Sequence, residues 1–133
     1  MKYLETQEIL VIHDQIIEET GGVHGVRDIG LLQSATVRPR TAIAGKEMFG
    51  SIFEKAASLL EAFARFHVFT DGNKRTAAIA SARFLAINNH ELTATNDELV
   101  IFMVSVVESR LEITEIAAWF KKHSKRIRKG SNK

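Results

Sequence analysis

The apolar residues of this 133-residue chain recur mostly at the three- and four-residue intervals that are typical of amphipathic helices. In the N-terminal part, this spacing predicts a helix that Thr6 can cap and that ends near the turn at Thr20-Gly21-Gly22. A second helix is predicted between Asp28, which can cap it, and Pro39, which discourages its continuation. Residues 38–50 show no sustained period, so we expect a loop or a short hairpin there.

Two capping boxes mark further helices. The sequence S-x-x-E at residues 51–54 precedes an apolar run that reaches about Phe66, and T-x-x-E at residues 95–98 precedes a run that reaches about Ser109. The second run is rich in β-branched residues and could be a buried strand. Its length and its capping box favour a helix buried on most of its circumference.

Helical spacing also predicts a helix from about residue 73 to Ile87, stopped by Asn88-Asn89, and a last helix from Thr114. The residues expected to face inward from these two helices are Ile79, Ala80, Phe84, Ile87, Ile116, Trp119 and Phe120. The pattern therefore predicts an all-α bundle, with at most a two-stranded flap near residues 38–50. One domain is expected over residues 1–122, followed by a basic tail at residues 123–133 that frays.

Composition narrows the function classes. The chain has no cysteine, which excludes a disulfide scaffold, thiol catalysis and a thiolate zinc site. His13, His24, His90 and His123 have no shared metal-binding spacing, and we expect structural or surface roles for them.

The net charge of +2 hides an asymmetry, because residues 121–133 carry seven basic residues and no acid. The rest of the chain is mildly acidic, which speaks against a specific nucleic-acid reader. The tail itself suits a solubilising helix end, or alternatively contact with RNA or with an acidic partner.

No segment has the pattern of a secretory signal or of a membrane span. Glu5 and Glu8 interrupt the N-terminus, and the longest apolar run, residues 99–107, is far shorter than the roughly 20 residues that a span needs. We therefore expect no membrane partner and a cytoplasmic protein.

The residues with chemical potential lie together at positions 67–75, HVFTDGNKR. Gly72 and Asn73 open a predicted helix, and the unpaired N–H groups of a helix N-terminus bind phosphate. Lys74 and Arg75 place two cations where the helix dipole is already positive, so an anion is expected there. This arrangement suits a nucleotide polyphosphate.

The other residues of this segment supply matching roles. Asp71 is a hard oxygen ligand of the kind that holds Mg²⁺ together with phosphate oxygens. His67 can take a proton from a hydroxyl at neutral pH, and Phe69 is expected to anchor the loop in the core. Each feature alone also fits an ordinary role, since a lone histidine, an Asp-Gly-Asn turn and a Lys-Arg pair are common on protein surfaces.

HVFTDGNKR resembles the H-x-F-x-D-[AG]-N-K-R motif of the death-on-curing (Doc) toxins, a branch of the Fic-domain superfamily. The segments GVRDIGLLQSATVRP and RTAAIASARFLAINNHEL are also similar to that family, and the resemblance covers roughly residues 1–120. It implies a compact six-helix Fic/Doc-type bundle in which residues 38–50 form the flap that docks the target segment.

The resemblance also implies roles for single residues. His67 would be the general base and Asp71 would hold the Mg²⁺ that bridges the phosphates of ATP. The backbone of Gly72 and Asn73 would form an anion hole, with help from the Asn73 side chain. Lys74, Arg75 and Arg65 would bind phosphates, and Phe69 would be the loop anchor.

One departure from the wider superfamily bears on the reaction. Fic enzymes that transfer AMP read G-N-G-R-x-x-R, whereas this chain has Lys74 and Ala78 at the second glycine and the second arginine. Doc-type toxins share both changes. The resemblance therefore implies a kinase that transfers the γ-phosphate of ATP to a threonine hydroxyl of translation elongation factor Tu and halts protein synthesis. An AMP transferase and a non-catalytic protein-binding module are the alternatives.

We expect another protein chain to inhibit the activity. Self-inhibited Fic proteins carry an [S/T]-x-x-x-E-[G/N] helix, and no Glu in this sequence is followed by Gly or Asn. The resemblance implies a Phd-type antitoxin whose disordered segment folds on the toxin.

Overall fold

The computed structural model describes residues 1–127, and within them the chain forms a mostly helical bundle, as predicted. The six α-helices are α1 (Thr6–Thr20), α2 (Ile29–Val37), α3 (Ile52–Arg65), α4 (Asn73–Ile87), α5 (Asn96–Glu108) and α6 (Ile113–Lys122). A short 3₁₀ helix, η1 (Arg38–Arg40), follows α2. The strands are β1 (Ala42–Ile43), β2 (Lys46–Glu47), β3 (His90–Leu92) and β4 (Ser124–Arg126).

Local capping places most helix starts where the sequence predicts them. Asp28 accepts a hydrogen bond from the N–H of Leu31, and Ser51 and Thr95 complete their capping boxes at the starts of α3 and α5. Helix α1 begins at Thr6 but is capped by Glu5 and not by Thr6, and α6 begins at Ile113, one residue before the predicted start. These caps satisfy backbone N–H groups that would otherwise lack partners.

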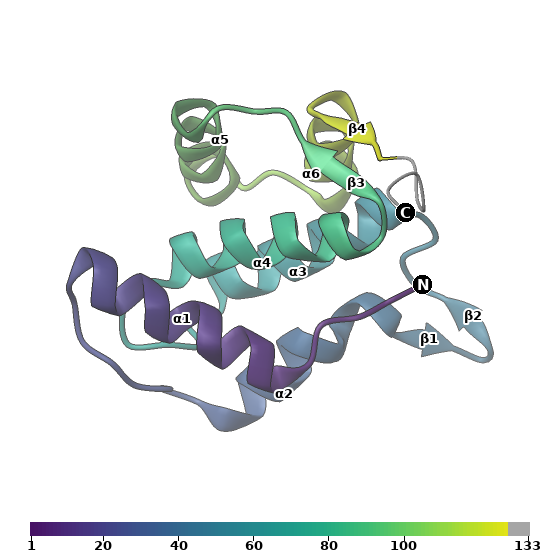
Figure 1. Ribbon diagram of the computed structural model, residues 1–133. Helices are drawn as coiled ribbons and strands as arrows, with labels where there is room; N and C mark the ends of the chain where they lie inside the picture. The colour runs from purple at the N-terminus through teal and green to yellow at the C-terminus, as the bar shows by residue number, and fades with distance from the viewer. Residues whose placement is uncertain (128–133) are drawn as a thin grey trace, which may run out of the picture.

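The core is built around α3 and α4, which pack against each other along their length (Figure 1). Helices α1 and α2 lie on one side of this pair, and α5 and α6 form a layer on the other side. Because α3 is in the middle, it is buried nearly all round, with small residues such as Ala56, Ala57 and Ala62 allowing close approach.

Residues 38–50 form η1 and the β1–β2 hairpin, which confirms the predicted flap. The hairpin lies at the start of α3, whereas the 67–75 segment follows the end of that helix (Figure 1). Since α3 has 14 residues, about 20 Å of helix separates the two. The flap is thus present, and Arg38 at its start lies over the ring of Phe66, next to His67. Its role in docking a target stays a prediction.

The C-terminal part of the chain differs from the expectation of a fraying tail. Residues 124–126 form β4, which pairs antiparallel with β3, with His90 opposite Arg126. The prediction that the chain frays after Lys122 is therefore wrong for this strand. The remainder of the basic tail, residues 128–133, lies outside the described residues.

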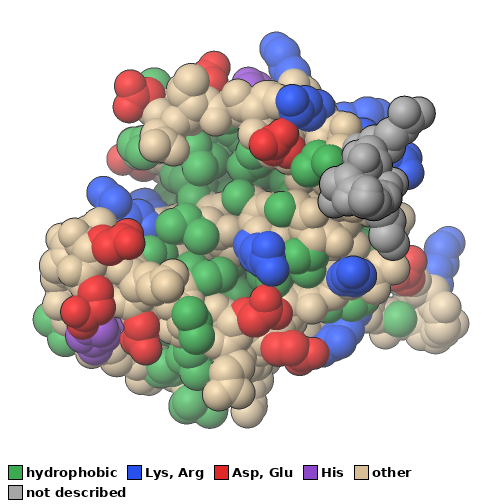
Figure 2. All heavy atoms as spheres, viewed as in Figure 1, with side chains coloured by type: hydrophobic (Ala, Val, Ile, Leu, Met, Phe, Trp, Pro, Cys, Tyr) green, Lys and Arg blue, Asp and Glu red, His purple; other side chains and the backbone are tan. Residues whose placement is uncertain are grey.

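Burial of two helices also differs from the prediction. Ile79 of α4 is 46% exposed, and α5 buries only Phe102, Met103 and Val106 while Val100, Ile101 and Val104 are exposed. Figure 2 shows apolar side chains along the boundary between the layer of α5 and α6 and the central pair α3 and α4. Helix α5 packs against the core on one side only, so its apolar run is not surrounded.

Among the described residues, no helix combines the length and apolarity needed to cross a bilayer.

Candidate functional site

The ends of α1 and α3 meet the beginning of α4 at one end of the molecule (Figure 1). They surround an open cavity of about 630 Å³. The residues that line it are Thr20, Gly21, Gly22, Ala64, His67, Thr70, Asp71, Gly72, Asn73, Lys74 and Arg75. Except for Phe69, which is buried beneath, and Arg65, the fold brings together every residue that the sequence marks as a candidate.

The N-terminus of α4 faces this cavity without a side-chain cap. Gly72 precedes the helix in the left-handed conformation, with φ of 78°, and the first helical backbone bond runs from the N–H of Thr76 to the carbonyl of Gly72. The N–H groups of residues 73–75 are consequently left for a ligand. Such an end, with its positive dipole, binds phosphate.

Two cations add to this positive end. Lys74 and Arg75 are exposed, and neither has an ion-pair partner within residues 1–127. A pair of unmatched cations at a helix N-terminus is unfavourable unless an anion joins them. The arrangement therefore favours a polyphosphate ligand.

Asp71 supplies a carboxylate at the edge of the cavity. The N–H of Val23 donates to its Oδ2 at 2.8 Å, and the other oxygen has no hydrogen-bond partner in the described part of the chain. No group of three or more His, Cys, Asp or Glu side chains that could hold a metal occurs there. A single carboxylate beside a phosphate site suits Mg²⁺, which is commonly held by one or two carboxylates and by substrate phosphates.

His67 is the second residue after the end of α3, and its backbone conformation is unusual. Its φ is 52°, in the left-handed region that non-glycine residues rarely adopt. Arg27 holds it there, since its Nε donates to the carbonyl of His67 at 2.6 Å and its Nη2 donates to the carbonyl of Phe66 at 3.2 Å. The imidazole is exposed and lines the cavity, so it is accessible to a ligand bound there.

Phe69 fixes the loop in the core, as the sequence predicts. It is 1% exposed and its ring stacks on His13, with centroids 3.8 Å apart, and on Phe63. The side chain of Asn73 holds the same residue, because it accepts from the N–H of Phe69 and donates to its carbonyl, both at 2.9 Å. The Asn73 amide is therefore engaged with the loop, and its backbone N–H is the group available to an anion.

Arg65 is not brought to the cavity. One nitrogen of its guanidinium pairs with Glu61, and the other donates to the carbonyls of Val106 and Leu111. These acceptors belong to α5 and to the connection between α5 and α6. Arg65 thus ties α3 to the α5–α6 layer, which is the physical reason that it does not serve as a phosphate ligand in this arrangement.

Sequence reasoning missed the wall opposite the motif. Gly21 and Gly22 read as a turn, yet they line the cavity, and a Cβ on Gly22 would lie 3.4 Å from the Asp71 carboxylate. The following residues run antiparallel to the motif loop, through a bridge between Val26 and Phe69. A double glycine is the only local signal of this role, and it does not reveal which segment it will face.

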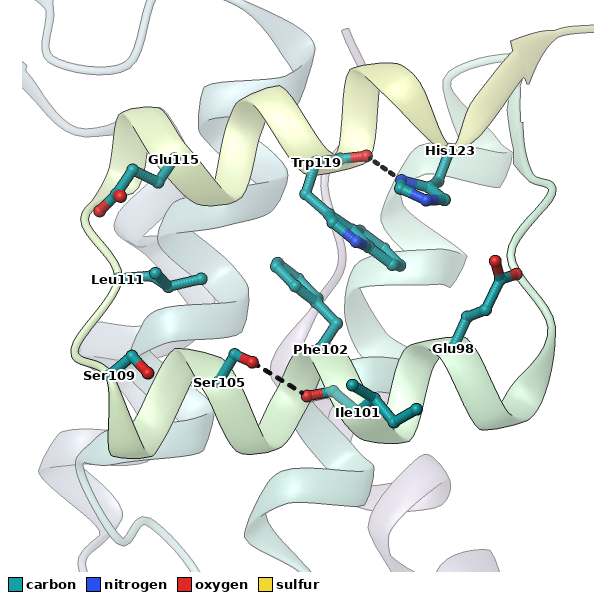
Figure 3. Close-up of a pocket in the computed structure, with 9 residues that line it drawn as sticks. All are labelled: Glu98, Ile101, Phe102, Ser105, Ser109, Leu111, Glu115, Trp119 and His123. Carbon is teal, nitrogen blue, oxygen red and sulfur yellow. Dashed lines mark hydrogen bonds between the residues drawn. The ribbon is translucent and has the colours of Figure 1, made fainter.

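A second open cavity lies between α5 and α6 (Figure 3). Its centre is the stacked pair Phe102 and Trp119, with centroids 3.9 Å apart, and the ring of His123 lies beyond Trp119. It holds none of the candidate residues, so we assign the chemistry to the cavity around the motif.

Comparisons with known proteins agree with this geometry. Residues 3–85 match the model of the Fic/DOC family. The chain is 40% identical over 96 residues to a "Toxin Doc" from Mycolicibacterium smegmatis, covering 72% of each chain. It is 30% identical over 117 residues to "Protein kinase doc" from Escherichia phage P1, covering 88% of this chain and 91% of the relative. With its motif loop, its uncapped helix and this extent of similarity, the chain belongs to the Fic/DOC family.

Proposed function

We propose that this protein is the toxin of a toxin–antitoxin module and acts as a kinase. In this proposal it transfers the γ-phosphate of ATP to a hydroxyl, that of a threonine, on translation elongation factor Tu and so halts protein synthesis. The observation that carries the proposal is the single cavity that joins His67, Asp71 and the uncapped N-terminus of α4. The names of the two relatives, a toxin and a protein kinase, support it.

In the proposed reaction His67 removes the proton from the attacking hydroxyl. A bond forms between the hydroxyl oxygen and the γ-phosphorus as the bond from that phosphorus to the β-phosphate oxygen breaks, and ADP leaves. The N–H groups at the start of α4, with Lys74 and Arg75, neutralise phosphate charge, since phosphoryl transfer depends on positioning and electrostatics. Mg²⁺ held by Asp71 would supply further neutralisation.

Ala78 supports phosphate transfer over AMP transfer. It stands where AMP-transferring relatives carry a second arginine, and in this fold it is 7% exposed on the core side of α4. Lys74, in place of a glycine, adds a side chain at the mouth of the phosphate site. Both features favour a donor whose γ-phosphate reaches His67.

The test uses purified elongation factor Tu, Mg²⁺ and ATP labelled with ³²P at either the γ or the α position. We expect label on the factor only from γ-labelled ATP, and His67→Ala should reduce the rate by roughly 10²–10⁴-fold. His123→Ala, which alters a histidine outside the cavity, is the matched control and should retain activity. Label from α-labelled ATP would show that the protein is an AMP transferase and not a kinase. If neither form of ATP labels the factor, both activities toward this target are refuted.

We further propose a Phd-type antitoxin as partner and a cytoplasmic site of action, where elongation factor Tu works. Coexpression of the antitoxin should relieve growth arrest, and the two chains should purify together. Growth arrest that persists with the antitoxin bound would contradict this assignment.

A further inference from the structure

His13 is a buried polar residue that the proposed reaction does not use directly. It lies in the middle of α1, is 2% exposed and does not line the cavity. Its ring stacks on Phe69 with an interplanar angle of 9°, and its Nε2 lies 2.8 Å from the carbonyl oxygen of Asp71. Because a carbonyl can only accept, Nε2 carries the proton and donates this bond.

The position of this bond links α1 to the candidate metal ligand. Asp71 is held at two points, at its carbonyl by His13 and at its carboxylate by the N–H of Val23. The next residue, Gly72, sits directly on α1, since a Cβ there would lie 3.3 Å from Ile17 and 3.6 Å from the ring of His13. The turn that carries Asp71 is therefore built on the surface of α1.

A side chain at this position that only filled space would leave the Asp71 carbonyl without this donor. An aliphatic side chain could fill the space beside Phe69 without the cost of burying a polar ring. The hydrogen bond of His13 goes to the residue whose carboxylate faces the cavity. Partners that orient a metal ligand in this way control metal affinity without touching the metal.

We propose that His13 is a positioning residue that holds the Asp71 carboxylate in the orientation needed to bind Mg²⁺ together with ATP phosphates. The proposal rests on the proposed function, because it assigns to Asp71 the role of magnesium ligand. It predicts that loss of the His13 donor weakens Mg²⁺-dependent binding of ATP while ATP binding without Mg²⁺ is retained.

The experiment compares His13→Gln with His13→Met in the full-length protein. The two side chains are similar in size, but only Gln keeps a donor near the place of Nε2. Calorimetric titration with ATP, in Mg²⁺ and in EDTA, gives the gain in affinity due to Mg²⁺. We expect His13→Met to lower that gain by about 10–100-fold and His13→Gln to keep most of it. Thr36→Val, which removes a buried hydroxyl from α2, controls for general destabilisation and should behave as wild type.

The outcomes separate the two proposals. If wild-type protein shows no gain from Mg²⁺, the proposed function fails and this inference fails with it. If wild type shows the gain and His13→Met retains it in full, only the inference is overturned. Should both variants fail to fold, the imidazole Nε2–H resonance of wild-type His13 still decides, since Mg²⁺ with ATP should shift it and an unchanged resonance would contradict the proposal.

Discussion

At the scale of single residues, His24 holds against α1 the segment that contains Gly21 and Gly22, which line the cavity. It lies on the loop after α1, and its two ring nitrogens face the carboxylates of Glu18, at 2.9 Å, and Asp14, at 3.3 Å. Both nitrogens can donate only when the imidazole is charged. The hydrogen bond to Glu18, followed by that to Asp14, raises the pKa of His24 above its ordinary value of 6.5.

This arrangement predicts a measurable titration. The folded protein favours the protonated ring, so its contribution to stability is complete below pH 6.5 and is lost as the pH rises through the higher folded-state pKa. A proton NMR titration should give His24 a pKa above 6.5, and Glu18→Gln should lower it. Glu19→Gln, on an exposed neighbour, should leave it unchanged. A wild-type value at or below 6.5 would show that the two carboxylates do not hold the ring.

Residue by residue, the sequence predicts the chemistry of the site better than its contacts. His67, Asp71 and Lys74 fall within one short segment, so the sequence alone predicts that they lie close together. The acceptors of Arg65, at residues 106 and 111, are more than forty positions away. No local pattern predicts such a contact, because only the packing of α5 and α6 on α3 creates it.

At the scale of elements, the flap is attached to α3 by a buried lysine. Lys55 is 1% exposed, and its Nζ donates to the carbonyl of Pro39 at 3.0 Å and to Glu47 at 2.8 Å. Burial lowers the pKa of Lys55, but hydrogen bonds to Glu47 and Tyr3 outweigh it and raise the pKa above its usual value. The ammonium therefore stays charged and holds η1 and β2 together.

Removal of this charge should loosen the hairpin. Hydrogen bonds to charged groups contribute roughly 1.5–3 kcal/mol each, so Lys55→Met should speed amide exchange in the flap by about 10–100-fold. The N–H of Met48, which bonds to the carbonyl of Thr41, is the probe. Lys46→Met, an exposed lysine on the same hairpin, is the control. Equal exchange rates in the two variants would mean that Lys55 does not anchor the flap.

The elements that the sequence predicts well are those with local signals. The capping boxes at residues 51–54 and 95–98 start α3 and α5 as expected. The strand pair β3–β4 joins residues more than thirty positions apart and has no such signal. The sequence also does not predict the exposure of α5, because an apolar run does not show how many other helices will pack around it.

At the scale of the whole molecule, the end of α4 fastens both ends of the described chain. The amide of Asn88 exchanges two hydrogen bonds with the backbone of Lys2, each 2.8 Å long. The carbonyl of Asn89 accepts from the N–H of Ile127, also at 2.8 Å. The turn that the sequence marks as a helix stop thus closes the fold.

Asn88→Ala should therefore weaken the whole domain. It removes the two bonds to Lys2 and a third to the carbonyl of Phe84. Because these groups are partly exposed, the expected loss is about 1–2 kcal/mol in the free energy of unfolding, measured in urea. Asn96→Ala, an exposed residue at the start of α5, should change it by less than about 0.5 kcal/mol. A loss no larger than that control would show that the N-terminal contact does not stabilise the domain.

The left-handed backbone of His67 sets a conflict between activity and stability at one position. Glycine adopts a φ near 52° without steric cost, whereas an imidazole-bearing residue is disfavoured there. Replacement by glycine would remove the proposed base and would also relieve the chain of that conformational penalty. In a lineage that is no longer selected for toxicity, His67→Gly could therefore abolish the activity and stabilise the folded protein by the same change.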